Sequence, residues 1–462
     1  MPATLQGART AGAAGRPRRY ALATAEHRDV LRISVSILIV MVVSRVHQIF
    51  HGLAALRPAL LVSLVAIGYA VAVRSALTRE NVLKQWWTRV ILAVVIQAQL
   101  SVLFGISTGN SGKFVLLAYS TVLMLMGLIV YSMRSWQDLV TFVVAFMFGL
   151  GALAYQTNFM FKLTTGSGLS RLNDMFAFDA NDVGLIFVTG VPLVSALVTV
   201  WSGYKKPLLL VLLAAIGVGI ARTGSRGAFL ALVVSGAALL LFNRGVPTRH
   251  RLVFAAAVVV ALFIAAPPGY FDQMMSIKDP KSDYNWTSPY GRREIAKRGI
   301  GYMIGHPIFG IGINNFRKAE CTISPRVFET SGGEGLAHCA APHNTWVQVG
   351  AELGIPGLIL WFVMLAYPMT KLFRLSRKLP LAWRRGDTEQ RFLFACAGAL
   401  PISILAFMIA SSFLTFAWID LPYLLVIFAG STWLFARRRL ARDDVAVMRR
   451  YANREPRWDG LA

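Results

Sequence analysis

Charged residues are scarce in this chain, and acidic residues are the scarcest of all. Only 15% of the 462 residues are Asp, Glu, Lys or Arg, whereas 56% are hydrophobic. Soluble globular domains carry about 25% charged residues. The shortage of charge excludes a soluble enzyme with one membrane anchor, and it predicts a polytopic membrane protein.

Long apolar runs stand where charged residues are missing. Runs able to cross a hydrocarbon core of about 30 Å recur along almost the whole chain. We therefore expect an all-α polytopic fold with about twelve transmembrane helices. The runs cover residues 33–50, 58–73, 90–106, 114–131, 138–155, 183–201, 207–221, 227–242, 252–267, 347–369, 392–414 and 421–436.

The centres of these runs also lack Lys, Arg and Asp. Transporters that couple to ions need ionisable groups inside the membrane, usually beside interrupted helices. This absence disfavours an ion-coupled transporter.

Positive charge outweighs negative charge, with 47 Lys and Arg against 22 Asp and Glu. If both termini are cytoplasmic, about two thirds of the Lys and Arg fall on the cytoplasmic side, as the positive-inside rule requires. We therefore expect an even number of spans. The net charge of +25 also favours anionic membrane lipid as a partner and does not imply nucleic acid.

The runs and charges divide the chain into five parts. Residues 1–30 form a basic cytoplasmic tail without a small-residue cleavage site behind it, so we expect an uncleaved start. Residues 31–267 hold the first nine spans, and 346–437 hold the last three. Between them, 268–345 form one long periplasmic loop with short helices, and 438–462 are a second basic cytoplasmic tail.

Cysteine is rare as well, with three residues in the chain. Cys321 and Cys339 share the long loop, whereas Cys396 lies in an apolar run. In an oxidising periplasm the loop pair is a candidate disulfide, and it would contribute about 3 kcal/mol by closing a loop. Two unpaired thiols are the alternative.

The stretch "RTGSR" joins two short apolar runs on the predicted periplasmic face. Runs 207–221 and 227–242 reach only about 22–24 Å as helices. Arg222 and Arg226 are thereby drawn towards headgroup depth, where an anion would stabilise a guanidinium. The alternative is a polar turn whose arginines reach lipid phosphates.

The loop stretch "SPYGRREIAKRGIGYMIGHP" predicts a helix over 289–304, with Ser288 as its cap. Steps of about 100° per residue place Arg292 on the apolar face and Arg293 on the other, with Glu294 and Arg298 spaced for an ion pair. An inward arginine needs an anion or a carboxylate. A structural ion pair is the alternative to a functional role.

The stretch "PHNTWVQVGAELGIPG" opens the tenth apolar run, and its Gly354-Ile-Pro356-Gly357 end predicts a break in the helix. Asn344 can cap this helix, which leaves His343 just outside a helix N-terminus, where the dipole disfavours the protonated imidazole. A neutral imidazole suits a general base. An interfacial polar group without chemistry is the alternative.

The stretch "DANDVG" needs no chemistry, because Asp179, Asn181 and Asp182 are favoured helix caps. A divalent cation would require further carboxylates that the same face does not offer. We therefore expect no metal.

Three segments together resemble the bacterial O-antigen ligase and polymerase superfamily. They are "RTGSRGAFLAL", "DYNWTSPYGRREI…GHPIFGIGINNF" and "PHNTWVQVGAELGIPG", in this order and with the long loop between the ninth and tenth spans. The resemblance covers roughly Asp179 to Trp361. It implies a protein of the bacterial inner membrane that transfers glycans from undecaprenyl diphosphate on the periplasmic side, without metal, nucleotide or other cofactor.

The resemblance also implies roles for single residues. The arginine of the short turn matches Arg226, the loop arginine matches Arg292 and the loop histidine matches His343, and we expect these three to be catalytic. Arg222 is a looser match. The residues that we expect to bind substrate are Arg222, Arg171, Tyr284, Asn285 and Asn344.

The implied reaction has one base and several arginines. An acceptor hydroxyl would give its proton to His343 and attack the anomeric carbon while the arginines hold the diphosphate. The acceptor stays open. It is the lipid A core for a ligase, another lipid-linked repeat for a polymerase, or a protein hydroxyl in a related group. A transporter of lipid-linked glycans remains a different class of function.

Overall fold

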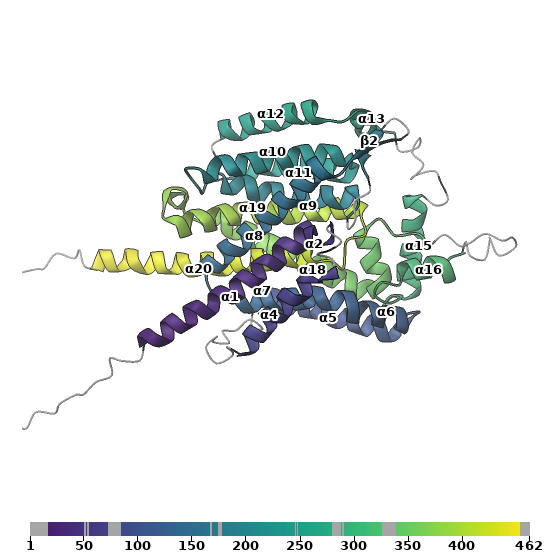
Figure 1. Cartoon of the computed structure of the whole chain (residues 1–462), viewed down its shortest axis with the longest axis horizontal. Coiled ribbons are helices and arrows are strands. Elements are labelled where there is room, and N and C mark those ends of the chain that lie inside the picture. The colour runs from purple at the N-terminus through teal and green to yellow at the C-terminus, as the bar shows by residue number, and fades with distance from the viewer. Residues whose placement is uncertain are drawn as a thin grey trace, which may run out of the picture.

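A computed structural model describes residues 17–49, 52, 55–72, 85–166, 169–173, 178–244, 246, 248–279, 288, 291–325 and 339–452. Its helices run roughly side by side in an elongated bundle (Figure 1). The first half contains α1 (Pro17–Ser44), α2 (Val46–Ile49), α4 (Pro58–Ala72), α5 (Trp86–Phe104), α6 (Thr108–Phe114), η2 (Val115–Tyr119), α7 (Ser120–Ser132), α8 (Trp136–Tyr155), η3 (Gln156–Met160), β1 (Leu163–Gly166), β2 (Leu169–Leu172) and α9 (Ala180–Leu197).

The second half begins with two helices joined by a tight turn and ends with a long helix that leaves the bundle. Its elements are α10 (Lys205–Thr223), α11 (Arg226–Phe242), α12 (Thr248–Ala265), α13 (Tyr270–Met275), α15 (Arg292–Gly305), α16 (Phe316–Thr322), α18 (Thr345–Lys378), η5 (Leu381–Arg385), α19 (Thr388–Ala410), η6 (Ser411–Phe413) and α20 (Asp420–Ala452).

Each predicted apolar run coincides with a helix, so the all-α membrane fold is confirmed. Within the described residues, seven helices are long and apolar enough to cross a membrane. Three shorter apolar helices accompany them: Val30–Ser44, Pro58–Ala72 and Arg226–Phe242. The count of twelve spans stays a prediction.

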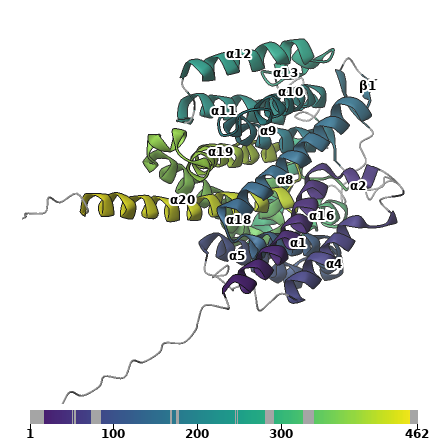
Figure 2. The ribbon, with the colours of Figure 1, turned by 60° about the vertical axis from the view of Figure 1, so that its left-hand side comes forward.

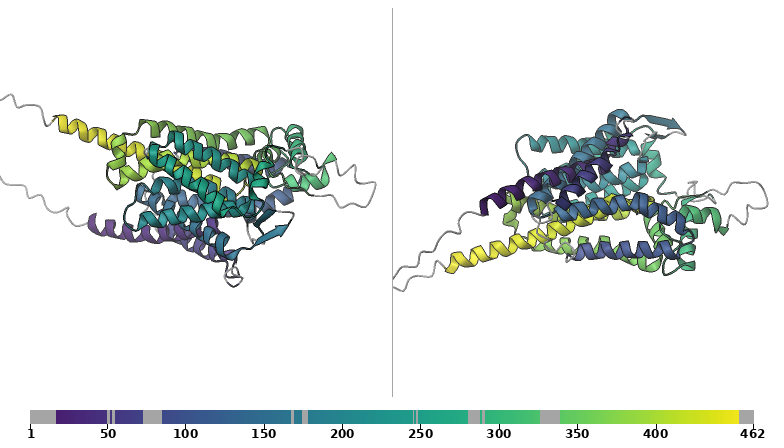
Figure 3. Two further views of the ribbon diagram at one scale, coloured as in Figure 1. Left: turned by 90° about the horizontal axis from the view of Figure 1, so that it is seen from above. Right: turned by 60° about the horizontal axis from the view of Figure 1, so that its bottom comes forward.

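The two ends of the bundle differ. Helix α1 starts and α20 ends at one end, whereas α15 and α16 lie at the other (Figure 3). This arrangement agrees with an even number of spans. The short helices α13, α15 and α16 fall within the predicted long loop.

Helices α9 and α19 form the centre of the bundle and pack along each other. In the most apolar 18-residue stretch of each helix, 83% of α9 and 78% of the α19 segment is buried, against 33% of α5 and of α10. Figure 2 shows α12 at the outer edge, beside α10 and α11. Large apolar side chains such as Leu116, Phe148 and Val211 point outwards, as expected of a surface that faces lipid.

Helix α18 is broken at Gly354, whose φ of 74° and ψ of −175° are not helical. The predicted break at Gly354 to Gly357 is therefore confirmed. Pro356 lacks an N–H, so the break leaves the carbonyls of Ala351, Glu352 and Leu353 without their usual helical donors.

A loop before α16 satisfies these groups. The N–H of Ile311 donates to Ala351 O at 2.8 Å, and that of Gly312 donates to Glu352 O at 3.1 Å. In return, the Ile355 N–H donates to Pro307 O at 2.8 Å. Gln97 of α5 adds bonds from Nε2 to Leu353 O at 2.9 Å and to Ile308 O at 2.8 Å. The break is thus joined to both the loop and α5.

A small antiparallel hairpin, β1–β2, adds the only strands among the described residues. Its register pairs Leu163 with Leu172 and Thr164 with Arg171. The sequence reading did not predict this hairpin. It lies at the same end of the bundle as α13, where the Ser170 N–H donates to Pro268 O at 3.1 Å.

The break in α18 yields a stability prediction. In Gly354→Ala the new Cβ would lie 2.7 Å from the Ile308 carbonyl, at a positive φ that alanine disfavours. We expect a loss of roughly 1–3 kcal/mol, seen as a lower apparent melting temperature in detergent. Gly301→Ala in α15 is the control, because nothing lies within 4 Å of its Cβ position and alanine favours a helix. Equal melting temperatures for the two variants would contradict the conclusion that the break in α18 requires glycine at position 354.

Candidate active site

Four helices begin close together at the end of the bundle that carries the loop helices. Asp179 caps α9 by accepting from the N–H groups of Asn181 and Asp182, and Asn344 caps α18 by accepting from those of Trp346 and Val347. Both predicted caps are confirmed. Helices α11 and α15 begin directly at Arg226 and Arg292. Because a helix N-terminus carries partial positive charge, this end favours an anion.

The η6 turn and the three residues after it connect these helix starts. The Phe413 side chain closes on Gly227, leaving 2.9 Å to a Cβ placed there. Its carbonyl accepts from Arg292 Nη1 at 3.4 Å. Thr345 Oγ1 donates to Leu414 O at 2.8 Å and accepts from the Phe416 N–H at 3.0 Å. The starts of α11, α15 and α18 are thereby held around one turn.

His343 occupies an unusual backbone position beside this turn. Its φ is 44°, in the left-handed region that non-glycine residues rarely adopt. The His343 N–H donates to Thr415 Oγ1 at 3.0 Å, which holds the backbone there. The side chain is half-buried. The fold therefore fixes where the imidazole is placed.

Burial lowers the pKa of His343 below its usual value of 6.5, and the positive charge of Arg292 lowers it further. Asp179 opposes this shift and Arg317 adds to it. Arg292, Asp179 and Arg317 therefore all lie within electrostatic range of His343. The neutral imidazole expected from the sequence is thus supported by a desolvated, positively charged setting.

Arg292 is the inward arginine of helix α15, as predicted. Ile295, Gly299 and Tyr302 of the same face are buried, whereas Arg293 is exposed. The same steps of 100° per residue also predict Ile300 on the inner face, and this prediction is wrong, because Ile300 is 45% exposed. The helix begins at Arg292 and not at 289; Gly291 is its N-cap, so the predicted Ser288 cap is wrong too.

The predicted pairing of Glu294 with Arg298 is replaced by two other ion pairs. Glu294 accepts from Lys297 Nζ at 2.7 Å. Arg298 pairs with Glu320 of α16 at 2.6 Å, and Tyr302 Oη donates to Glu320 Oε1 at 2.7 Å. This buried cluster joins α15 to α16 and thereby holds in place the helix that begins with Arg292.

Arg226 connects the start of α11 to the end of α13. Its Nη1 donates to Ser276 Oγ at 3.1 Å, and Ser276 in turn donates to Gln273 O at 2.7 Å. Helix α10 has 19 residues and α11 has 17, both longer than their apolar runs, because polar residues extend the helices. Arg222 lies in the last turn of α10.

Arg222 contacts backbone carbonyls rather than the centre of the site. Its Nε donates to Thr157 O and its Nη2 donates to Phe161 O, both at 3.0 Å. These carbonyls belong to η3 and the residue after it, where a helix ends and accepts such donors. Arg222 therefore fixes the end of η3 onto α10, and its contact with substrate stays a prediction.

Cys321 of α16 and Cys339 form a disulfide, with Cα atoms 5.0 Å apart. The predicted pairing is thus confirmed. Arg317 Nε donates to Cys339 O at 3.2 Å, so the disulfide also helps to hold Arg317 near His343.

The other predicted binding residues are less central. Arg171 lies in β2, opposite Thr164 of β1, and its contact with substrate stays a prediction. The Oδ1 atom of Asn344 is engaged in capping, and its contact with substrate stays a prediction. Tyr284 and Asn285 lie outside the described residues. Within the described chain, no three His, Cys, Asp or Glu residues are grouped so as to hold a metal ion.

The sequence reading missed Phe413, Thr415 and Arg317, and it assigned Asp179 only a capping role. The stretch "SSFLTF" that holds Phe413 and Thr415 carries a weak signal, since Ser411, Ser412 and Thr415 gather at the end of an apolar run. Nothing in the local pattern connects it with His343, which lies at least seventy residues earlier in the chain.

The family described as O-antigen ligase matches residues 208–362, about a third of the chain. The matched segment contains Arg222, Arg226, Arg292 and His343, whereas Asp179 and η6 lie outside it. No curated protein matches the chain. The match confirms the resemblance that the three sequence segments indicated.

The setting of His343 predicts its reactivity towards diethyl pyrocarbonate, which modifies an imidazole only in its neutral form. Because the pKa is lowered, the neutral form of His343 predominates at pH 6.5, where an ordinary histidine is half protonated. We expect the pH midpoint of its modification, located by peptide mass spectrometry, to lie below 6.5. N-acetylhistidine in the same buffer is the control. A midpoint above that of the control would show that the imidazole is not desolvated beside positive charge.

Proposed function

We propose that this chain, a bacterial membrane protein of the O-antigen ligase superfamily, transfers a glycan from an undecaprenyl-diphosphate carrier to an acceptor hydroxyl. The observation that carries the proposal is the grouping of His343, Arg292 and the start of α11 around the η6 turn. One neutral base and several cations suit a reaction that removes one proton and releases one polyanion.

His343 is the general base in this reaction. It takes the proton of the acceptor hydroxyl as that oxygen attacks the anomeric carbon. The bond from the anomeric carbon to the diphosphate oxygen breaks, and its electron pair leaves on undecaprenyl diphosphate. A single displacement of this kind inverts the anomeric configuration.

Arg226 and Arg292 bind the diphosphate and stabilise its developing charge. Guanidinium groups form charge-assisted bonds with phosphate oxygens, and the nearby N-termini of α11 and α15 add favourable dipoles. A diphosphate is a good leaving group, so it needs this stabilisation more than a proton. The reaction requires neither a metal nor a pair of carboxylates of the kind that glycosidases use.

Sidedness supports a periplasmic site in the inner membrane. The start of α1 and the end of α20 lie at the same end of the bundle, which the positive-inside rule assigns to the cytoplasm (Figure 3). The site lies at the opposite end, where an undecaprenyl carrier would present its glycan to the periplasm.

We favour a ligase-like acceptor, the lipid A core, over a second lipid-linked repeat as in a polymerase. Both reactions use the same donor groups, so the acceptor distinguishes them by experiment. A transporter of lipid-linked glycans would need anion-binding groups along a path through the membrane. Arg226, Arg292 and Arg317 instead gather at one end of the bundle, which favours the transferase.

The decisive assay uses purified protein in liposomes with a synthetic undecaprenyl-diphosphate glycan. Lipid A core and a second lipid-linked glycan are offered as separate acceptors, with and without EDTA. We expect product on the lipid A core and release of undecaprenyl diphosphate, unchanged by EDTA. Product on the lipid-linked glycan alone would identify a polymerase, and movement of intact donor between leaflets without product would identify a transporter.

Variants in the same assay test the individual roles. We expect His343→Ala to lower kcat by about 10²–10⁴ and Arg292→Ala by about 10²–10³, because base and anion stabilisation are lost. Arg293→Ala is the matched control, since the neighbouring side chain is exposed, and it should stay within about threefold. Equal losses in Arg292→Ala and Arg293→Ala would remove Arg292 from the site.

Thr415 is a positioning residue, because it acts on His343 through the backbone. Thr415→Val removes the acceptor of the His343 N–H, so we expect kcat to fall about tenfold with little change in KM for the donor. Thr415→Ser keeps the hydroxyl and should restore kcat. If the serine variant is as slow as the valine variant, packing of the methyl group and not the hydrogen bond is what matters.

A further inference from the structure

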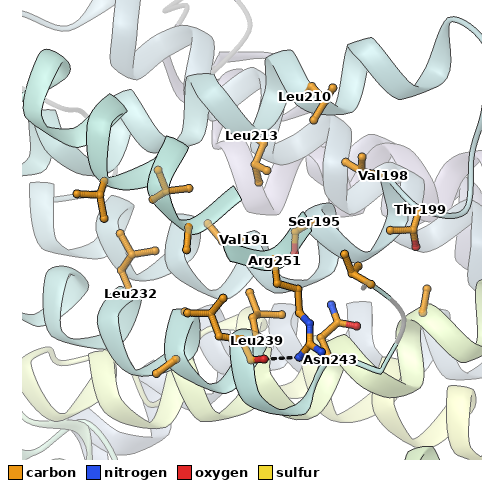
Figure 4. A pocket seen from close by; sticks show the side chains of 18 of the residues that line it. Val191, Ser195, Val198, Thr199, Leu210, Leu213, Leu232, Leu239, Asn243 and Arg251 are labelled. Atoms are coloured by element: carbon orange, nitrogen blue, oxygen red, sulfur yellow. Dashed lines mark hydrogen bonds between the residues drawn. The ribbon is translucent and has the colours of Figure 1, made fainter. Parts of the chain in front are cut away.

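A large apolar cavity runs along the bundle from α13, which Arg226 contacts, to the end opposite the candidate active site. Its volume is about 1090 Å³, just above the roughly 300–1,000 Å³ of small-molecule sites. It lies among α9, α10, α11, α12 and the start of α19, with walls of side chains such as Val191, Leu213 and Leu232 (Figure 4). None of its lining residues is among the predicted catalytic or substrate-binding residues.

Positive charge gathers at one end of this cavity. Its basic lining residues are Lys206, Arg251, Arg384, Arg385 and Arg391. They come from the first turns of α10, α12 and α19 and from η5. Among the described residues that line the cavity there is no Asp or Glu. The cavity is thus an apolar chamber with a basic mouth, formed by these five side chains.

The basic mouth has hydrogen-bonding capacity that the surrounding protein does not use. The Nε atoms of Arg251 and Arg391 are buried without a hydrogen-bond partner in the described structure. The nearby carboxylates of Asp387 and Glu389 are engaged by Arg439 of α20, at 2.6 Å and 2.9 Å. Buried cations and donors need a partner, and an anion at the mouth would supply one.

The cavity opens sideways towards the bilayer. Leu210, Val233 and Val259 line it and are 44–52% exposed. In a membrane these exposed side chains face lipid chains. A ligand that enters here arrives through the bilayer and must itself have long apolar chains.

The mouth lies at the end of the bundle opposite the candidate active site. The 17 residues of α11, from Arg226 to Phe242, span about 26 Å, too far for one headgroup to reach both ends. The mouth shares its end with the start of α1 and the end of α20, which the positive-inside rule assigns to the cytoplasm (Figure 1). The ligand is therefore a lipid of the cytoplasmic leaflet.

We propose that this cavity binds an anionic diacyl phospholipid, with its phosphate at the basic mouth and its acyl chains between α10, α11 and α12. Guanidinium groups match phosphate oxygens in geometry and charge. Basic pockets between transmembrane helices on the cytoplasmic side bind anionic lipid headgroups for the same reason. The proposal does not depend on the glycosyltransferase function, because neither donor nor acceptor is involved.

Native mass spectrometry of the delipidated full-length protein tests the proposal. Phosphatidylglycerol, cardiolipin, phosphatidylcholine and undecaprenyl phosphate are titrated separately. We expect both anionic phospholipids to bind at least tenfold more tightly than phosphatidylcholine. In Arg384→Gln/Arg391→Gln this preference should fall at least tenfold, since about 1 kcal/mol per cation corresponds to this factor for two cations. Arg374→Gln/Arg377→Gln, with exposed side chains at the same end but outside the cavity, is the control of equal charge and should bind as the wild type does.

Folding and location have their own readouts. The Lys206→Gln/Arg385→Gln variant changes exposed side chains and provides the same test if the first variant does not fold. A phosphatidylglycerol with a diazirine on its acyl chain should cross-link to residues of α10, α11 or α12. Equal affinity for phosphatidylcholine, an equal effect of the control variant, cross-links elsewhere, or tighter binding of undecaprenyl phosphate would each overturn the proposal.

Discussion

The break in α18 at Gly354 is the constraint on which the site end of the molecule depends. Three carbonyls lose their helical donors there, and in a membrane-buried bundle such groups must find partners. Ile311, Gly312 and Gln97 supply them. The position of the loop before α16 is therefore fixed, because the backbone N–H groups of this loop replace the missing helical donors of α18.

The same loop carries this constraint into the core. The buried Glu352 carboxylate accepts from Trp418 Nε1 at 2.5 Å and from the Asn314 N–H at 2.9 Å. One side chain thus joins α18, the loop and the segment before α20. Helix α16 begins at Phe316, directly after this loop, so the loop also fixes the position of α16. Glu320 of α16 then pairs with Arg298 of α15. Arg292, at the start of α15, is placed through this chain of contacts.

Features set by local physics could be predicted from the sequence. Apolar length predicted the helices, and short polar side chains predicted the caps at Asp179 and Asn344. Periodicity identified Arg292 rather than Arg293 as the inward arginine, and glycine with proline predicted the break in α18. The shared compartment of Cys321 and Cys339 predicted their bridge. Each of these depends on neighbours along the chain or on a property of one segment.

Features set by contacts between distant segments could not be predicted. Arg298 had a carboxylate in reach at Glu294, yet it pairs with Glu320, because the tertiary contact is buried and the local one is exposed. Arg222 was expected to face an anion, but carbonyls at the end of η3 take two of its nitrogens. Phe413 and Thr415 have no motif of their own. Their importance comes from the turn that brings the starts of α11, α15 and α18 together.

The electrostatics of the site follow from this convergence of helix starts. Helix N-termini and arginines create a positive potential, and burial strengthens it by removing water. The same potential that would attract an anion also disfavours a proton on His343, so the cations and the neutral base are two results of one arrangement. Asp179 moderates the effect from the cap of α9. A base that is kept neutral by its surroundings needs no carboxylate to orient it, because the backbone bond to Thr415 already holds the residue in place.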